Sequence, residues 1–418
     1  MKRHIVIVGN GITGITTARF IRKYSSDRIT VVSSETDHFY ARTALMYIYM
    51  GHMRYQETKP YEDAFWSKNK IDLVRGYAYQ VDTDAQIVRI ADGNDIAYDA
   101  LLLATGSQSN KFGWPGQDLD GVQGLYGMQD LALMERNTKG IQRGVVVGGG
   151  LIGIEMAEML HARGIDVTFL VREKSYMDYL LPQEESQIIN KEILDHGIDL
   201  RLTTELKAIH GEKMVDSVET SEDDRIDCQF VGLTAGVHPN IDVAKASGLE
   251  TNRGIVVNEF FETSVPNVYA AGDCAEFNAD GIGSRRIEQL WYTGRAHGKV
   301  VASTLTGQRT PYRRGVFFNS AKFFTIEYQT YGDIPVKPES NVRSQVFQSG
   351  RKLLRINSDR TTGRVLGFNV MGLRLRQDQC EAWIRDHAQV DDVMIQLKKA
   401  RFDPEFYSHA VYRQAAAA

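Results

Sequence analysis

The feature that most constrains this chain is a strand, glycine turn and helix pattern that occurs twice. Residues 4–8 form a β-branched apolar run that leads into Gly9-Asn-Gly11-Ile-Thr-Gly14 and then into an apolar helix pattern. Residues 144–147 repeat the run and lead into Gly148-Gly-Gly150-Leu-Ile-Gly153. Each helix pattern is followed by a second buried strand pattern. The sequence therefore predicts two βαβ units, each contributing to a parallel sheet.

Both turns have the spacing at which backbone amides and a helix N-terminus approach a pyrophosphate. The glycines predicted to bind it are Gly9, Gly11 and Gly14 in the first unit and Gly148, Gly150 and Gly153 in the second. Glu35 follows the first turn by 21 residues, where a carboxylate accepts hydrogen bonds from a ribose 2′-hydroxyl. Arg172 takes the matching place in the second unit and suits a 2′-phosphate, although it also fits an ordinary solvated arginine. Glu173 would repel that phosphate, so we expect only a modest preference for NADPH over NADH.

The composition of the chain restricts the kinds of ligand that we expect it to bind. The chain has 418 residues and a formal net charge of -4, with no long basic run, so nothing favours nucleic acid as a ligand. No segment approaches the roughly 18 to 20 apolar residues of a membrane-spanning helix. Cys228, Cys274 and Cys380 are far apart and show no metal-ligand spacing, so no metal site is predicted. We expect a protein of the reducing cytoplasm whose ligands are small molecules.

Strand and helix patterns outside the two turns predict the domain organisation. Residues 71–89 alternate apolar and polar side chains, as antiparallel strands do, and 98–103 form a buried strand pattern. Residues 265–273 resemble the end of the first unit, which makes the first domain discontinuous. From residue 311 onward, several strand patterns and a helix at 378–387 predict an α+β domain. The fold class is therefore α/β, with two Rossmann-like domains at 1–115 plus 245–310 and at 116–244, and a C-terminal α+β domain at 311–414.

Three motifs occur in order along residues 1–310. They are the first glycine turn with Glu35, the sequence Ala104-Thr105-Gly106, and the sequence Ala270-Ala-Gly272-Asp273. Together they resemble the FAD-dependent pyridine nucleotide oxidoreductases, the glutathione reductase-like superfamily. The resemblance implies FAD in the first domain and NAD(P)H in the second. It also implies that Asp273 and the preceding Gly272 hold the flavin side chain and that Thr105 and Gly106 mark the crossing between the domains; taken alone, Asp273 also fits a helix cap.

Residues 36–47 indicate the branch of this superfamily, because they contain no cysteine where disulfide and peroxide reductases carry theirs. Thiolate chemistry is therefore disfavoured. The stretch resembles that of ferredoxin and rubredoxin reductases and of apoptosis-inducing factor. In that branch Arg42 would lie against the FAD phosphates, with a surface arginine as the alternative. Tyr47 replaces a lysine that pairs near the flavin with a glutamate matching Glu155.

Further site residues follow from the same likeness. Glu155 is the expected contact of the nicotinamide carboxamide, and with Tyr47 it forms the predicted catalytic pair. A helix beginning at Arg286 would direct its N-terminus, with Glu288 and Gln289, toward the flavin.

The expected function is hydride transfer from NAD(P)H to FAD, with electrons passed on to an unidentified carrier such as a ferredoxin or rubredoxin. A type II NADH:quinone reductase and a flavoprotein with mainly a binding role, as in apoptosis-inducing factor, remain as alternatives. The sequence leaves the acceptor, the choice of coenzyme and a homodimeric state open.

Overall fold

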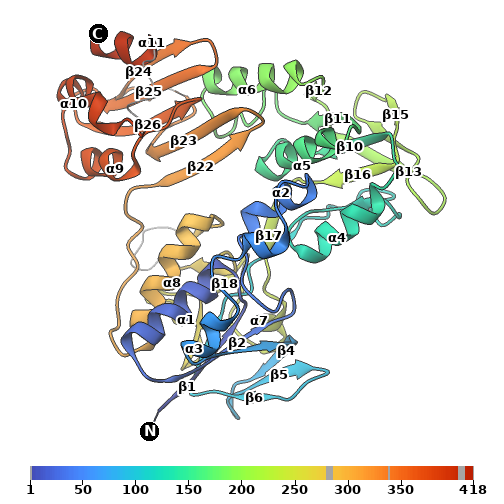
Figure 1. The fold of residues 1–418 in the computed structure, drawn as a ribbon, viewed down its shortest axis with the longest axis vertical. Helices are drawn as coiled ribbons and strands as arrows, with labels where there is room; N and C mark the ends of the chain where they lie inside the picture. The colour runs from blue at the N-terminus through green and yellow to red at the C-terminus, as the bar shows by residue number, and fades with distance from the viewer. Residues whose placement is uncertain (1, 279–285, 338, 403–409, 418) are drawn as a thin grey trace. The chain divides into compact units, whose positions relative to one another are not determined.

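The computed structural model describes residues 2–278, 286–337, 339–402 and 410–417, and Figure 1 shows their course. The chain folds into two compact units. Unit 1 comprises residues 1–110, 124–139 and 236–313, and unit 2 comprises residues 111–123, 140–235 and 314–418. The three-domain limits given by the sequence patterns stay a prediction.

A five-stranded parallel sheet forms the centre of unit 1. Its strand order is β19 (Val268–Ala270), β7 (Ala100–Leu103), β1 (His4–Val8), β2 (Arg28–Ser33) and β3 (Ile71–Arg75). β7 is buried along its whole length, as expected for a strand covered on both faces. β19 pairs with β7, so residues 268–270 add a strand to the sheet of the first fold. The antiparallel prediction for 71–89 is wrong at its start, because β3 extends the sheet parallel to β2.

Two helices that are far apart in the sequence pack against each other in unit 1. They are α1 (Ile12–Tyr24) and α8 (Trp291–Leu305), which lie side by side in Figure 1. A Cβ atom on Gly298 would lie 2.7 Å from the carbonyl oxygen of Thr13, so this glycine allows the close approach. The prediction of a helix from Arg286 is wrong, because Arg286–Ile287 form strand β21 and pair with β20 (Ala275–Phe277). Glu288 and Gln289 therefore precede the helix.

Smaller elements complete unit 1. An antiparallel sheet contains β4 (Tyr77–Asp82), β5 (Ile87–Ala91) and β6 (Ile96–Ala97), and α7 (Asp242–Ala246) packs on β4. The other strands are β8 (Ser107–Ser109), paired with β17 (Val237–Pro239), and β18 (Ile255–Val257), paired with β20. The remaining helices are α2 (Leu45–Tyr49), α3 (Ala64–Lys68), α4 (Met128–Asn137) and the 3-10 turns Arg42–Ala44 and Tyr55–Thr58.

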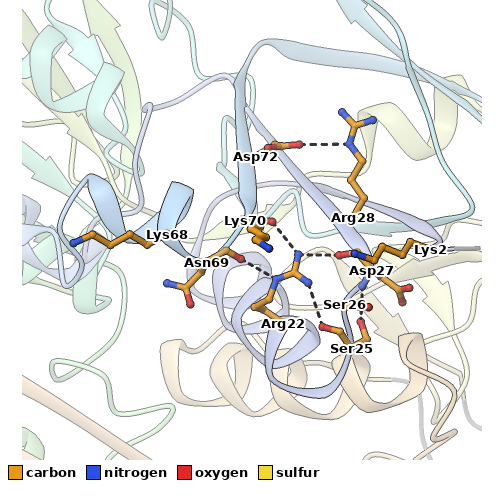
Figure 2. A pocket seen from close by; sticks show the side chains of 10 residues that line it. All are labelled: Lys2, Arg22, Ser25, Ser26, Asp27, Arg28, Lys68, Asn69, Lys70 and Asp72. Carbon is orange, nitrogen blue, oxygen red and sulfur yellow. Dashed lines mark hydrogen bonds and ion pairs between the residues drawn. The ribbon is translucent and has the colours of Figure 1, made fainter.

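A hollow of about 560 Å³ lies where the strands of the unit 1 sheet begin (Figure 2). Arg22 is at its centre and donates hydrogen bonds to the backbone carbonyl oxygens of Ser25, Asp27, Asn69 and Lys70. These contacts join the end of α1 to the end of α3. The Arg22 guanidinium therefore has a structural role. In a parallel sheet of this kind, ligands bind at the carboxyl ends of the strands, which lie at the opposite edge of the sheet.

Unit 2 contains a second five-stranded parallel sheet. Its strand order is β12 (Asp199–Leu202), β11 (Asp166–Val171), β10 (Arg143–Val147), β16 (Phe230–Leu233) and β9 (Val122–Gln123). The helices of this fold are α5 (Leu151–Ala162) and α6 (Gln183–Asp195), and the antiparallel strands are β13 (Leu206–His210), β14 (Ser217–Thr220) and β15 (Arg225–Asp227). The two parallel sheets confirm the predicted α/β fold class with two Rossmann-like folds.

An antiparallel sheet follows in the C-terminal part of unit 2. Its order is β22 (Phe318–Phe323), β23 (Ile326–Gly332), β26 (Val365–Met371), β25 (Lys352–Asp359) and β24 (Val342–Ser349). The helices here are α9 (Gln377–Arg385), α10 (Val390–Gln396), the 3-10 turn Leu397–Ala400 and α11 (Ala410–Ala417). Among the described residues, no helix is both long enough and apolar enough to cross a bilayer.

Candidate functional site

The first glycine turn has the geometry that a pyrophosphate requires. A Cβ atom on Gly9, whose φ is +117°, would lie 2.1 Å from the carbonyl oxygen of Ala104, and one on Gly14 would lie 2.0 Å from that of Gly9. Both positions therefore require glycine. A Cβ atom on Gly11 would meet no neighbouring atom within 4 Å, and this residue caps α1 without a side-chain hydrogen bond. The helix N-terminus can thus receive a negatively charged group, which fits the diphosphate of a dinucleotide.

Glu35 lies just after β2 and accepts several hydrogen bonds. The Tyr40 hydroxyl and one Arg42 nitrogen donate to its Oε1 atom, at 2.5 Å and 2.9 Å, and a second Arg42 nitrogen donates to Oε2 at 2.5 Å. The backbone amide of Met128 adds a bond to Oε1 at 3.1 Å. Burial would raise the pKa of Glu35, but the Arg42 guanidinium and these hydrogen bonds hold it below the ordinary value. Glu35 is therefore a fixed carboxylate near the turn, as an acceptor for ribose hydroxyls should be.

Arg42 is fully engaged within unit 1. Besides Glu35, its guanidinium donates to the carbonyl oxygen of Tyr126 at 2.6 Å and lies 4.4 Å from the centre of that ring. Its two-pronged pairing is with a carboxylate, so the predicted contact with the FAD phosphates stays a prediction.

Tyr126 is a site residue that the sequence patterns do not identify. Its hydroxyl accepts a hydrogen bond from the Ser107 amide at 2.9 Å and lies 3.4 Å from Asp273 Oδ2. A Cβ atom on Gly106 would lie 2.7 Å from the same hydroxyl. Tyr126 belongs to a segment that returns to unit 1 after residues 111–123 have entered unit 2. No local pattern marks such a return, so nothing in the sequence signals this contact.

Asp273 follows the strand β19 and lies close to the residues already described. The Ser107 hydroxyl donates to its Oδ2 atom at 3.3 Å, and Gln289 donates to that hydroxyl at 2.8 Å. Burial raises the pKa of Asp273, and the Ser107 hydrogen bond and Arg42 oppose the rise. Thr105 donates to the carbonyl oxygen of Asn240 at 2.6 Å, which fixes the start of this turn.

The second glycine turn repeats the geometry of the first. Gly148 has a φ of +115°, and its Cβ atom would lie 2.8 Å from backbone atoms of Ala235. A Cβ atom on Gly153 would lie 2.1 Å from the carbonyl oxygen of Gly148. Gly150 caps α5 without a side-chain hydrogen bond, and the nearest group to its Cβ position is the Tyr179 hydroxyl at 3.9 Å. Unit 2 therefore offers a second N-terminus that fits a diphosphate.

The strand end beside the second turn presents an acid to the turn and an arginine to solvent. The Glu173 side chain is 16% exposed, and a Cβ atom on Gly149 would lie 3.5 Å from its Oε2 atom. The Arg172 side chain is 71% exposed and pairs with Glu173 at 3.0 Å. The predicted role of Arg172 in holding a 2′-phosphate stays a prediction.

Glu155 and Tyr47 lie in different units. Glu155 is half-buried in α5, where burial and the nearby Glu158 raise its pKa to about 7. Tyr47 lies in α2, and its ring stacks on that of His52 with centroids 6.3 Å apart. Their action as a pair at the flavin stays a prediction.

The Glu288 carboxylate is engaged by neighbouring side chains of unit 1. The side chain is buried and contacts His297, Tyr312 and Arg286. Gln289 reaches Asp273 only through Ser107. Direct contacts of Glu288 and Gln289 with the flavin stay predictions.

Cys274 follows Asp273, and its environment is structural. Its thiol is buried and donates to the carbonyl oxygens of Leu103 and Ala271, at 3.4 Å each. Burial raises its pKa, which disfavours the reactive thiolate.

The fold and the site define a protein with two dinucleotide-binding folds in one chain and no redox thiol at the first site. The model of the pyridine nucleotide-disulphide oxidoreductases matches residues 3–298. The chain belongs to this family, as the three motifs predict. FAD and NAD(P)H, the cofactors expected from the resemblance, fit the two turns.

Curated relatives cover different shares of the chain. Rhodocoxin reductase of Rhodococcus erythropolis is 32% identical over 76% of this chain and 76% of its own. An NADH oxidase of Methanocaldococcus jannaschii is 32% identical over 88% and 87%. The electron transfer subunit of the assimilatory nitrate reductase of Bacillus subtilis is 30% identical over 73% of this chain, which spans about two fifths (39%) of that relative's length.

Among solved structures, a ferredoxin reductase from Rhodopseudomonas palustris has the same fold. It aligns over 100% of both chains with a TM-score of 0.81 and 23% identity.

Proposed function

We propose that this protein oxidises a reduced pyridine nucleotide at bound FAD and passes the electrons to a small redox protein. The observation that carries the proposal is the pair of glycine turns, each with an open helix N-terminus, in one chain. Residues 36–47 supply no cysteine, and the Cys274 thiol is held by two carbonyl oxygens. Electron transfer through a thiol therefore has no support at this site.

The chain's residues bind and orient the reactants. When bound, FAD supplies the chemistry, because a flavin accepts a hydride and releases electrons singly. The α1 N-terminus holds the FAD diphosphate, Glu35 accepts from the ribose, and Asp273 binds the flavin side chain. Glu155, with a pKa of about 7, is partly protonated at neutral pH and donates a hydrogen bond to the nicotinamide carboxamide.

We further propose that NADH is the preferred coenzyme, which reverses the preference inferred from Arg172. Glu173 faces the second turn, where its carboxylate accepts from ribose hydroxyls and repels a 2′-phosphate. Glu173→Gln should lower kcat/KM for NADH about tenfold, equivalent to about 1.4 kcal/mol, and should not lower that for NADPH, because the repulsion of the 2′-phosphate is removed. Arg172→Ala is the matched control and should change neither value more than about twofold. A wild-type preference for NADPH, abolished by Arg172→Ala, would contradict the assignment.

A redox protein is favoured as the acceptor because rhodocoxin reductase and rubredoxin reductases are among the relatives. We expect both proteins to meet in the reducing cytoplasm. The second candidate function is that of an NADH oxidase. It is favoured by the similarity to the Methanocaldococcus jannaschii NADH oxidase, which covers 88% of this chain. Steady-state NADH oxidation with oxygen alone, compared with oxidation in the presence of ferredoxins and rubredoxins, separates the two. We expect at least one carrier to accelerate turnover well above the oxygen rate. Rapid turnover with oxygen that no carrier increases would support the oxidase instead.

A further inference from the structure

A buried polar cluster behind the Gly272–Asp273 turn has no role in the proposed chemistry. His297 lies in α8, and its side chain is fully buried, while Glu288 and Tyr312 are 5% and 1% exposed. The Phe261 ring packs against the imidazole with centroids 5.1 Å apart. A polar group enclosed among aromatic rings is costly unless it is hydrogen-bonded.

Two hydrogen bonds define the state of the imidazole. The backbone N–H of Gly272 donates to His297 Nδ1 at 3.2 Å. Nδ1 must then carry a lone pair, which leaves the single proton of a neutral imidazole on Nε2. Nε2 lies 3.3 Å from Glu288 Oε2, so it donates to the carboxylate. His297 therefore connects the backbone of the turn to a buried acid.

Glu288 is fixed from other directions as well. The Tyr312 hydroxyl donates to the same Oε2 atom at 2.8 Å, and Arg286 Nε lies 3.2 Å from Oε1. The charged groups around His297 are thus Glu288, Arg286 beyond it, and Asp273. A carboxylate held by three side chains is a rigid anchor for the Nε2 proton.

The turn itself is closely packed. Gly272 has a φ of +84°, and a Cβ atom there would lie 2.5 Å from Thr13 Oγ1. Gln289 supports the Asp273 carboxylate through Ser107, as described above. The adjacent residues Glu288 and Gln289 therefore support the same turn through separate chains of hydrogen bonds. Glu288 acts through His297 on the Gly272 amide, and Gln289 acts through Ser107 on the Asp273 carboxylate.

We propose that His297, anchored by Glu288, is a positioning residue that places Asp273 for binding FAD. It acts through the Gly272 amide and touches neither cofactor nor substrate. This inference rests on the proposed function only in assigning FAD to unit 1.

The test replaces His297 by side chains that keep one of its two hydrogen bonds. An asparagine places an oxygen where Nδ1 lies and can accept from Gly272, whereas a glutamine reaches toward Glu288, and a leucine does neither. FAD dissociation constants are measured by reconstitution of the apoprotein, and thermal midpoints on the same samples. His297→Asn should bind FAD within about threefold of wild type, and His297→Gln and His297→Leu about tenfold or more weakly, the effect of losing one hydrogen bond at a buried site.

Phe261→Leu is the matched control, since it alters packing on the same imidazole and leaves both hydrogen bonds in place. It should lower the thermal midpoint and leave FAD affinity unchanged. Equal FAD affinity in all variants would overturn the proposal. So would losses of affinity that follow the thermal midpoints in every variant, Phe261→Leu included, because packing alone would then explain them. Wild-type protein that binds FAD but passes no electrons to a carrier would refute the proposed function and leave this inference standing.

Discussion

The Glu155 carboxyl couples the stability of α5 to pH. Its ordinary pKa is 4.5, and in the folded protein burial and Glu158 raise it to about 7. Between these pH values the folded chain holds a proton that the unfolded chain has lost. The free energy of unfolding therefore falls as the pH rises from about 4.5 to 7, by up to about 3 kcal/mol.

Glu155→Gln removes this loss of stability at high pH, because an amide stays neutral at every pH. Relative to wild type, the variant should melt at a higher temperature at pH 8 and lose that advantage at pH 5. Circular dichroism melting at both pH values measures the two differences. A difference that is the same at pH 5 and pH 8 would show that the carboxyl titrates at its ordinary pKa.

At the scale of single residues, the sequence predicts what backbone sterics decide. Gly14 and Gly153 are required by clashes with the glycine five residues earlier, and Gly9 and Gly148 have a positive φ, so the pattern is visible locally. The direction in which a side chain at a strand end points is harder to predict from the sequence. Val171 ends β11 and is buried, Arg172 is exposed, and Glu173 faces the second turn. Residue type alone therefore indicates Arg172, and not Glu173, as the residue that contacts the coenzyme.

At the scale of elements, a buried ion pair joins α6 to the C-terminal sheet within unit 2. Arg355 in β25 is buried and donates to both carboxylate oxygens of Glu185, at 2.7 Å and 2.8 Å. Asn369 in β26 donates to the same carboxylate at 3.2 Å. Because both charges lie out of water, losing one would leave the other buried and unpaired.

Arg355→Met should therefore destabilise unit 2 by about 3 to 5 kcal/mol. Arg201→Ala is the control, because Arg201 pairs with Asp199 at the surface and should cost about 1 kcal/mol or less. Urea unfolding followed by circular dichroism compares the two variants. A loss for Arg355→Met no greater than that for Arg201→Ala would contradict the account of this junction.

Elements whose pairing is local follow closely from the sequence, whereas the partner of β3 and the position of the Tyr126 segment do not. β1, β2, β10 and β11 lie within their own βαβ units and are predicted closely. β3 has an alternating pattern, yet it pairs parallel with β2 across the intervening residues 34–70. Tyr126 enters the first site only because its segment returns to unit 1. Such choices depend on the whole fold and leave no local signal.

At the scale of the whole molecule, the proposed electron transfer requires no thiol chemistry. Cys228, Cys274 and Cys380 are buried, and none forms a disulfide in the structure. The triple variant Cys228→Ser, Cys274→Ser, Cys380→Ser should keep FAD and oxidise NADH at close to the wild-type rate, measured with an artificial acceptor. A variant that folds and holds FAD but no longer oxidises NADH would show that a thiol takes part.

The central claim is that a hydride passes from the pyridine nucleotide to FAD as the sole redox group of the chain. Anaerobic titration of the purified protein with NADH, followed by flavin absorbance, tests it most directly. One equivalent of NADH per FAD should remove the oxidised flavin spectrum, and an oxidised carrier should restore it. A flavin that stays oxidised, or complete reduction only after two equivalents, would contradict the account, because the second result requires another redox group.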